Sequence, residues 1–220
     1  MTFTLVARCR DTGMLGLAVS SSSPAVASRC IHARAGIGAF ATQNFTDPAL
    51  GRRGLDLMEK GASAAQAIDI VSATASDAPF RQLAAIGPQG VPAGFTGASC
   101  LAKTAECIGA DCVAVGNLLA SEGVPAAMVA AFEASRGHLA GRLIAGLAAG
   151  LALSFLVLGL FVATIGFAIG LDGEVFRKLA AALLVAAGSV LMLPVAQARL
   201  ALVAAPIGAW TEERFGGGKR

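Results

Sequence analysis

The stretch TFTLVARCRDTGMLGLAVS, residues 2–20, decides the fold of the first two thirds of the chain. In TFTLVAR (2–8) every second residue is Phe, Leu or Ala, and this two-residue period is typical of a β-strand with one buried face. The segment RDTG (10–13) predicts a turn in which Gly13 tolerates a positive φ, and MLGLAVS (14–20) predicts a second strand. The sequence therefore opens with an antiparallel hairpin.

The segments that follow alternate between strand and helix patterns. In chain order we expect a strand at GIGAFATQ (36–43), a helix over 50–60, a helix that opens with the capping box of Ser63 and Gln66, strands at RQLAAI (81–86), GVPAGFTG (90–97) and DCVAVGN (111–117), a helix over 126–135 and another from about 138. This order predicts an α+β fold in which helices pack against stacked antiparallel sheets.

The composition of the 220 residues excludes several classes of protein. Apolar residues make up 55% of the chain and charged residues 14%, and the mean hydropathy is +0.70, which is too apolar for an average soluble domain. The net charge is +3 and no basic run is interleaved with aromatic residues, so nucleic-acid binding is not expected. The five cysteines are irregularly spaced, which indicates buried thiols in a reducing compartment and neither a disulfide framework nor a metal site.

The charge pattern changes near Gly150. The uncharged stretches 143–171 and 179–198 are each long enough to cross a bilayer, for which about 20 apolar residues suffice. The alternative is a pair of buried core helices, but the length of both runs favours membrane spans. We therefore expect one domain over 1–150, followed by a transmembrane helical hairpin with a short polar tail over 151–220. Because the N-terminus has no signal-peptide pattern, we expect the protein in the inner (cytoplasmic) membrane, with its N-terminal domain in the cytoplasm.

Thr2 is a candidate catalytic residue. Initiator methionine is normally removed before a small residue, and its removal would leave Thr2 with a free α-amine beside its hydroxyl. Such a residue holds nucleophile and base together, because an amine with a pKa near about 8 can take the hydroxyl proton. Thr2 also heads the first strand, where an N-terminal nucleophile is needed, although many non-catalytic proteins also begin Met-Thr.

Several long segments resemble, in order, a known family: TFTLVARCRDTGMLGLAVSSSSPAVASRC, HARAGIGAFATQN, GRRGLDLMEKGASAAQAI, RQLAAI, VAVGNLLAS and AFEAS. The family is the domain of unknown function 1028, which is grouped with the N-terminal nucleophile (Ntn) hydrolases. The resemblance covers residues 1–150, and it implies a four-layer αββα sandwich and hydrolysis of an amide bond in a substrate that it does not identify.

The same resemblance implies roles for particular residues. It places Thr2 at the position of the nucleophile expected of the superfamily, and it places Gln43, Asn44 and Asn117 where substrate is bound. An amide side chain can hold a substrate carbonyl or a developing oxyanion. The alternative from the residues alone is that these amides lie at turns or strand ends and bond to local backbone.

The family pattern ends after GLAAG (146–150), where members continue with strands that complete the sandwich. Here LALSFLVLGLFVATIGFAIG (151–170) and the residues after it instead resemble a fragment of the cytochrome c biogenesis and thiol-disulfide interchange membrane family. The tail has no cysteine, so only the topology of that family is implied. We therefore expect the C-terminal strands of the sandwich to be missing and residues 1–150, produced alone, to be loosely packed and without amidase activity.

Three functions remain open from the sequence. The first is a membrane-tethered Ntn-type amidohydrolase, inactive if the missing strands are needed. The second is a non-catalytic membrane protein, or a chimeric product of a frameshift or deletion. The third is a membrane component of cytochrome c assembly. The expected partners are the lipid bilayer and an unidentified small-molecule or peptide substrate. A homo-oligomer is left open, and no nucleic acid, metal or cofactor is expected.

Overall fold

The computed structural model describes residues 1–168 and residue 178. The chain divides into two compact units, Met1–Leu160 and Phe161–Arg220. The first unit contains the sheets and the candidate site.

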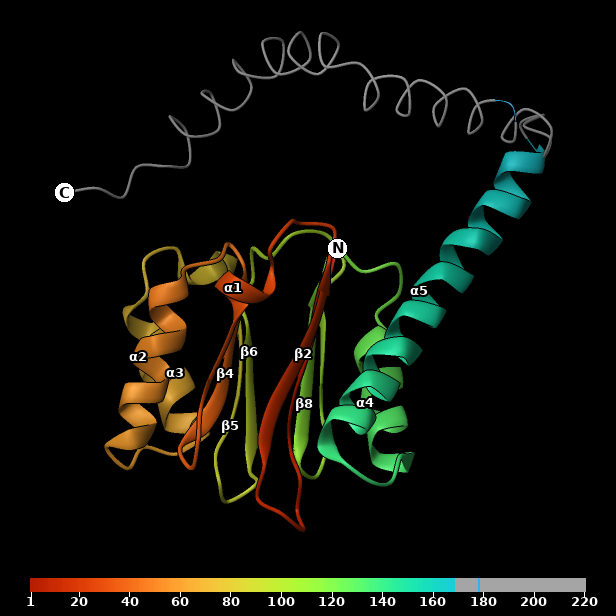
Figure 1. The fold of residues 1–220 in the computed structure, drawn as a ribbon. Helices are drawn as coiled ribbons and strands as arrows, with labels where there is room; N and C mark the ends of the chain where they lie inside the picture. The colour runs from red at the N-terminus through yellow and green to blue at the C-terminus, as the bar shows by residue number, and fades with distance from the viewer. Residues whose placement is uncertain (169–177, 179–220) are drawn as a thin grey trace, which may run out of the picture. The chain divides into compact units, whose positions relative to one another are not determined.

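Two antiparallel sheets form the centre of the first unit (Figure 1). The first sheet has the strand order β2-β1-β8-β7 and consists of β1 (Thr2–Arg8), β2 (Leu15–Ser21), β7 (Ala105–Ile108) and β8 (Cys112–Asn117). The second has the order β3-β4-β5-β6 and consists of β3 (Ile31–Arg34), β4 (Gly38–Asn44), β5 (Arg81–Ile86) and β6 (Pro92–Thr96). The expected α+β fold with two antiparallel sheets is confirmed.

Strand β1 is a central strand that is paired along both edges. Thr2 lies opposite Ser21 of β2 on one side and opposite Asn117 of β8 on the other. Phe3 and Leu5 are fully buried against the helices, so the alternate residues of β1 face the second sheet. Pairing of the first strand therefore does not depend on the strands expected to be missing from the C-terminal part of the chain.

Helices cover the outer face of each sheet and produce four layers (Figure 1). They are α2 (Pro48–Glu59), α3 (Ala64–Thr74), α4 (Val124–Ala134) and α5 (Leu139–Ala168). Helices α2 and α3 pack on the second sheet around Phe40 and Leu83, whereas α4 and the first half of α5 pack on the first sheet around Phe3 and Leu5. A third core lies between the sheets.

The helix starts follow local sequence signals. Helix α2 begins after Asp47, whose carboxylate accepts a hydrogen bond from the Ala49 N–H at 2.9 Å, and Pro48 occupies the first turn, where its missing N–H costs nothing. Helix α3 begins with the predicted capping box. The Gln66 N–H donates to Ser63 Oγ at 3.2 Å, and the Ser63 N–H donates to Gln66 Oε1 at 2.9 Å.

Sequence reasoning missed the shortest elements. These are α1 (Ala27–Cys30), β3, the 3₁₀ turn η1 (Ala78–Phe80) and β7. Strands β3 and β7 are edge strands of four residues with partly exposed side chains. A strand of that length has too few residues to show a two-residue period of hydrophobicity.

Helix α5 continues without a break through residue 150, at which a domain boundary was expected. Leu139 and Leu143 are buried in the core of the helix-covered face, and Gly146 packs closely against β1. The predicted membrane span, 143–171, therefore begins inside a layer of the sandwich, because apolar residues suit a protein core as well as a bilayer.

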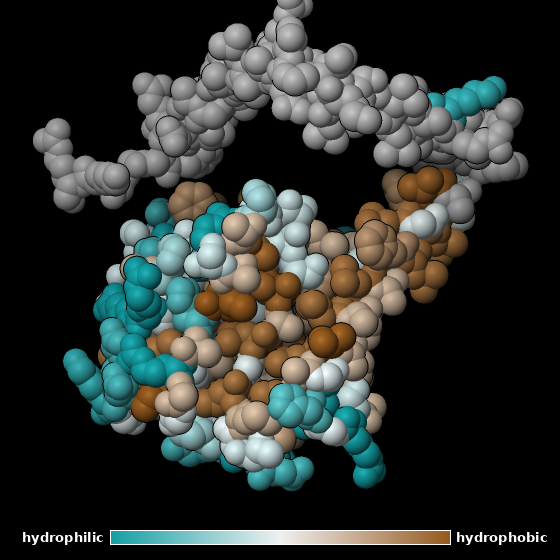
Figure 2. Space-filling view, in the orientation of Figure 1, coloured by the Kyte–Doolittle hydropathy of each residue, from teal (hydrophilic) through white to brown (hydrophobic). Residues whose placement is uncertain are grey.

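Among the residues that the structure describes, one helix, Leu139–Val162, is long and apolar enough to cross a membrane. The second predicted span, 179–198, lies outside the described residues. Figure 2 shows apolar side chains along the part of α5 that extends beyond the sheets. Phe155 and Leu156 in this part are each 67% exposed.

Candidate active site

The layer between the two sheets has an apolar end and a polar end. The apolar end consists of Val6, Ala39, Ala41, Ala84, Ile86, Val113 and Val115. Two residues further along four of these strands stand Thr4, Gln43, Gln82 and Asn117, all of them buried. Because side chains alternate across a strand, they face the same space between the sheets. Buried polar groups need hydrogen-bond partners, so this end of the layer must form a network.

Gln43 and Gln82 join the two sheets. Gln43 Oε1 accepts from Thr4 Oγ1 at 2.6 Å, while Gln43 Nε2 donates to Gln82 Oε1 at 2.7 Å and to the Val115 carbonyl at 3.3 Å. Gln82 Oε1 also accepts from Asn117 Nδ2 at 3.1 Å. Thr4, Val115 and Asn117 belong to the first sheet and both glutamines to the second, so these bonds fix the position of one sheet on the other.

From Gln82 the network extends to the surface. Gln82 Nε2 donates to the Gly116 carbonyl at 3.0 Å and to Thr96 Oγ1 at 3.1 Å. The Thr96 hydroxyl then donates to Glu106 Oε2 at 2.9 Å. Glu106 is exposed, so a continuous chain of hydrogen bonds leads from the buried amides to solvent.

Thr2 lies at the polar end of this layer. It is the first residue of β1, is half-buried, and shares the inter-sheet face of that strand with Thr4. Thr2 Oγ1 and Ser21 Oγ are 2.8 Å apart and hydrogen-bonded. Asn117 is the cross-strand neighbour of Thr2 on the other side. Thr2 therefore stands between Ser21 of β2 and Asn117 of β8 at one edge of the layer.

Met1 precedes Thr2 in the structure, and its side chain packs partly buried against the core on the helix side. The Met1 ammonium donates to Ser22 Oγ at 3.3 Å, and the Ser22 N–H donates to the Met1 carbonyl at 3.2 Å. While Met1 is present, the nitrogen of Thr2 is a peptide nitrogen and cannot act as a base. Nucleophilic chemistry by Thr2 with its own amine therefore requires that Met1 be removed.

All four predicted site residues lie at this end of the sandwich, but their surroundings differ. The side chain of Gln43 is fully buried, and its oxygen and nitrogen are both engaged within the protein. Asn44 has a φ of +69° and ties neighbouring segments together, because its Nδ2 donates to the Phe80 carbonyl at 2.7 Å and its Oδ1 accepts from the Leu101 N–H at 3.4 Å. Their roles as substrate ligands stay predictions.

Four side chains of the network were not singled out by sequence reasoning: Thr4, Gln82, Thr96 and Glu106. Thr4 could have been found, because it lies two residues after Thr2 in a strand of clear period. Gln82 follows Arg81 at the start of β5, before the apolar residues 83–86, so the pattern of the strand did not mark it as buried. Glu106 lies in β7, whose four residues gave no pattern to interpret.

The structure also bears on metal binding and on the reactivity of the thiols. The described residues contain no group of three or more His, Cys, Asp or Glu side chains placed to bind a metal ion. Burial raises the pKa of the Cys112 thiol to about 12, and burial also raises the pKa of Cys107. Both thiols are therefore protonated at neutral pH, which makes them poor nucleophiles and poor metal ligands.

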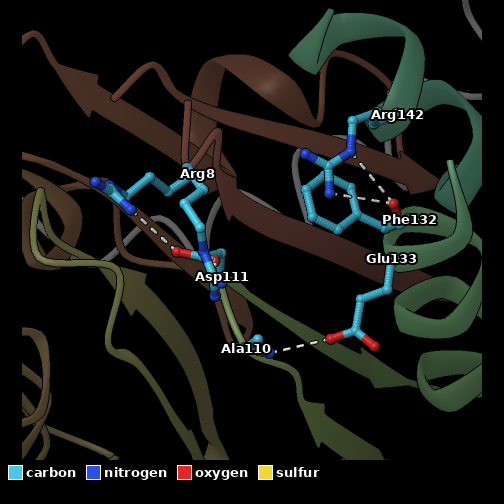
Figure 3. A network of polar contacts seen from close by, with 7 residues as sticks. Arg8, Ala110, Asp111, Phe132, Glu133 and Arg142 are labelled. Atoms are coloured by element: carbon cyan, nitrogen blue, oxygen red, sulfur yellow. Dashed lines mark hydrogen bonds and ion pairs between the residues drawn. The ribbon is translucent and has the colours of Figure 1, made fainter. Parts of the chain in front are cut away.

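The opposite end of β1 carries a charged cluster (Figure 3). Asp111 pairs with Arg8 Nη1 at 3.1 Å and with Arg10 Nη2 at 2.8 Å. Arg142 lies over the ring of Phe132, with its Cζ 4.1 Å from the ring centroid, and donates to the Phe132 carbonyl. Part of this cluster lines a cleft of about 770 Å³. Asp111 thus joins β1 to the turn before β8, and Glu133 of α4 accepts from the Ala110 N–H of that turn at 3.0 Å.

The chain belongs to the family of unknown function DUF1028, whose model matches residues 2–153. The crystal structure of a DUF1028 protein from Silicibacter pomeroyi is similar to this chain, with 30% sequence identity and a TM-score of 0.67 over 69% of this chain and 70% of that chain. No curated protein matches the sequence. The predicted resemblance to this family is confirmed, and the matched residues include both sheets, all four predicted site residues and the packed half of α5.

Proposed function

We propose that this protein is a membrane-tethered, Ntn-type amidohydrolase whose nucleophile is Thr2, freed by removal of Met1. The observation that carries the proposal is the place of Thr2. It heads a central strand of a helix–sheet–sheet–helix sandwich, its hydroxyl is 2.8 Å from Ser21 Oγ, and Asn117 lies opposite it on the next strand. A terminal threonine here presents its hydroxyl and its amine together at the polar end of the inter-sheet layer.

The proposed reaction needs only an amide substrate and water. The Thr2 α-amine takes the hydroxyl proton as Oγ1 bonds to the substrate carbonyl carbon. When the resulting oxyanion re-forms the carbonyl, the carbon–nitrogen bond breaks and the α-ammonium gives its proton to the leaving amine. Water then attacks the ester, again with the α-amine as base, and releases the acid and free Thr2.

Asn117 is the residue that we assign to the substrate carbonyl oxygen. It is the amide that lies opposite Thr2 in register, and its Nδ2 carries a second N–H besides the one that bonds to Gln82. Removing one such donor typically lowers kcat about 10²- to 10³-fold. Gln43 supports Asn117 through Gln82, and Asn44 holds the loop beside it.

We also propose that the chain is integrated into the inner membrane with the sandwich in the cytoplasm. The support is the exposed apolar part of α5 and the absence of charge between Arg142 and Asp172. Retention of the protein in the membrane pellet after alkaline carbonate extraction is the expected result. Release into the supernatant would contradict integration.

One observation favours a different class, a non-catalytic membrane protein. Met1 packs against the core and exchanges two hydrogen bonds with Ser22, so the sandwich accommodates a retained methionine. No comparable contact among the described residues favours a role in cytochrome c assembly, which rests on the sequence resemblance of the tail alone.

The two classes are separated by the state of the N-terminus. Intact-mass measurement of the purified full chain should show the loss of Met1, and a β-lactone probe should add to the new N-terminal threonine. The Thr2→Ala variant should not be labelled, whereas Thr12→Ala, which changes an exposed threonine in the β1–β2 turn, should label normally. Retention of Met1, or equal labelling of both variants, would contradict the proposed function.

A further inference from the structure

The direction of α5 along the first sheet determines where the helix leaves the sandwich. Gly16, which pairs with Ala7 at the far end of β1, lies against Leu143 of α5. A Cβ at Gly146 would come within 2.6 Å of Leu5 Cδ2. One turn later, a Cβ at Gly150 would lie 3.4 Å from Phe3 Cε2. Helix α5 therefore runs toward the Thr2 end of β1.

Helix α5 passes beyond the end of the first sheet at about the height of Met1. Four helical residues rise about 6 Å, and two strand residues span nearly the same length, so the turn after Gly150 is level with Met1. Ser154, in that turn, is fully buried, whereas Phe155 and Leu156 are exposed. Figure 1 shows α5 extending past the sheets at the end where the N-terminus lies.

The part of α5 beyond Ser154 is apolar on every side. Its exposed residues, spaced at about 100° per residue, point around the whole helix: Phe155, Leu156, Leu158, Leu160 and Phe161. A groove on a protein partner would cover only one face of such a helix. Lipid covers all faces, so the occupant that we assign to this segment is the bilayer.

A second, independent observation concerns the rim of the Thr2 end. Large apolar side chains stand exposed directly beside the strand ends there, between 42% and 53% accessible: Phe45, Phe80, Leu101 and Leu118. Phe45 follows Asn44, and Leu118 follows Asn117, so the rim borders two of the predicted site residues. The Phe45 and Phe80 rings are 6.2 Å apart, and they form one apolar surface.

We propose that the Thr2 end of the sandwich faces the membrane, and that the site acts on amides carried by amphiphiles at the bilayer surface. The apolar rim enters the lipid interface, and α5 enters the hydrocarbon beside it. This inference rests on the proposed function for its chemistry, but its geometry rests on α5 and the rim alone. A substrate with an acyl chain reaches the Thr2 hydroxyl from the bilayer without crossing water.

The orientation is tested by fluorescence quenching in the full chain, reconstituted in phosphatidylcholine–phosphatidylglycerol vesicles. With the single tryptophan changed (Trp210→Phe), a new tryptophan is placed at Phe80, on the rim, or at Val91, an exposed apolar residue in the turn at the far end. Lipids brominated near the headgroup should quench the F80W protein about twofold and leave V91W unquenched. Quenching of V91W but not F80W, or of neither, overturns the orientation.

The substrate class is tested with two β-lactone probes that share a reactive group and differ only in chain length, short or palmitoyl-like. In vesicles the long-chain probe should label Thr2 about tenfold faster. Phe80→Ser should reduce that preference severalfold without changing short-chain labelling, and the matched far-end variant Val91→Ser should change neither. Equal labelling by both probes overturns the amphiphile inference and leaves the hydrolase proposal standing. Labelling of Thr2 by neither probe contradicts both.

Discussion

The two ends of strand β1 are held by different kinds of interaction. At the Thr2 end, hydroxyl and amide groups meet in a network centred on Gln82, and this network reaches a carboxylate at the exposed Glu106. At the other end, Arg8 pairs with Asp111. The difference is informative because a threonine amine that acts as a base must be neutral. A carboxylate within about 4–6 Å would stabilise its charged form, so charge is tolerated at one end of the strand and would impair the proposed chemistry at the other.

The largest effect that we expect follows from Gln82→Leu, at the Thr2 end. The substitution removes the shared acceptor of Gln43 and Asn117 and the donor to the Gly116 carbonyl, all in a buried layer. The free energy of unfolding should fall by about 3 kcal/mol, measured by denaturant titration of the detergent-solubilised protein. Gln89→Leu, at an exposed turn, is the control and should change it by less than about 0.5 kcal/mol.

At the charged end, Asp111→Ala should lower the free energy of unfolding by about 2 kcal/mol, because it leaves Arg8 partly buried without its carboxylate. Thermal unfolding of the two proteins measures the change. Asp11→Ala removes an exposed carboxylate from the neighbouring turn and should have little effect. If both variants unfolded alike, the Arg8–Asp111 pair would not be what fastens this end.

A smaller change is expected from Thr4→Val, which keeps the shape of the side chain and removes the donor to Gln43 Oε1. The expected loss is about 1 kcal/mol, since one hydrogen bond is lost and one buried acceptor is left unpaired. Combining it with Gln82→Leu should give less than the sum of the two effects, because both substitutions break the same network. Full additivity would show that the two residues act separately.

Alkaline pH should lower the free energy of unfolding through Cys112, which pairs with Ala7 near the charged end of β1. Burial raises the pKa of this thiol from its ordinary value of 9.0 to about 12, so folding favours the protonated form. Below about pH 9 the thiol is protonated in both the folded and the unfolded protein, and its contribution to the free energy of unfolding is fully present. As the pH rises toward 12, the thiol ionises first in the unfolded protein, and this contribution is lost. Unfolding titrations at pH 8 and pH 10.5 should show a smaller alkaline loss of stability in Cys112→Val than in the unchanged protein. An identical loss would mean that Cys112 does not carry this dependence.

The smallest effect on stability is expected from Thr2→Ala. Thr2 is half-buried and its hydroxyl bonds to Ser21 at the end of the strand, so the free energy of unfolding should change by less than about 0.5 kcal/mol. The same variant should lose all β-lactone labelling. A loss of stability as large as that of Gln82→Leu would show that Thr2 is a structural member of the network.

Much of the fold could be predicted because its signals are local. The period of residues 2–8 predicted β1, and the pair Ser63 and Gln66 predicted the start of α3, where the capping box is present. The short edge strands were missed for lack of residues. For the site, the resemblance to the family indicated Gln43 and Asn117, but nothing in the sequence showed that Gln82 lies between them.

The sequence by itself determined the alternating strands, the helix starts and the long uncharged run, since each depends on neighbours within a few residues. Only the tertiary structure decided what meets between the sheets, because Gln43 and Gln82 are 39 residues apart and pair through strand register. It also decided which part of α5 packs in the sandwich and which part is exposed. Hydropathy measures how strongly a residue avoids water and cannot distinguish a protein core from lipid. Packing against Leu5 and Phe3 assigns the first half of the helix to the sandwich.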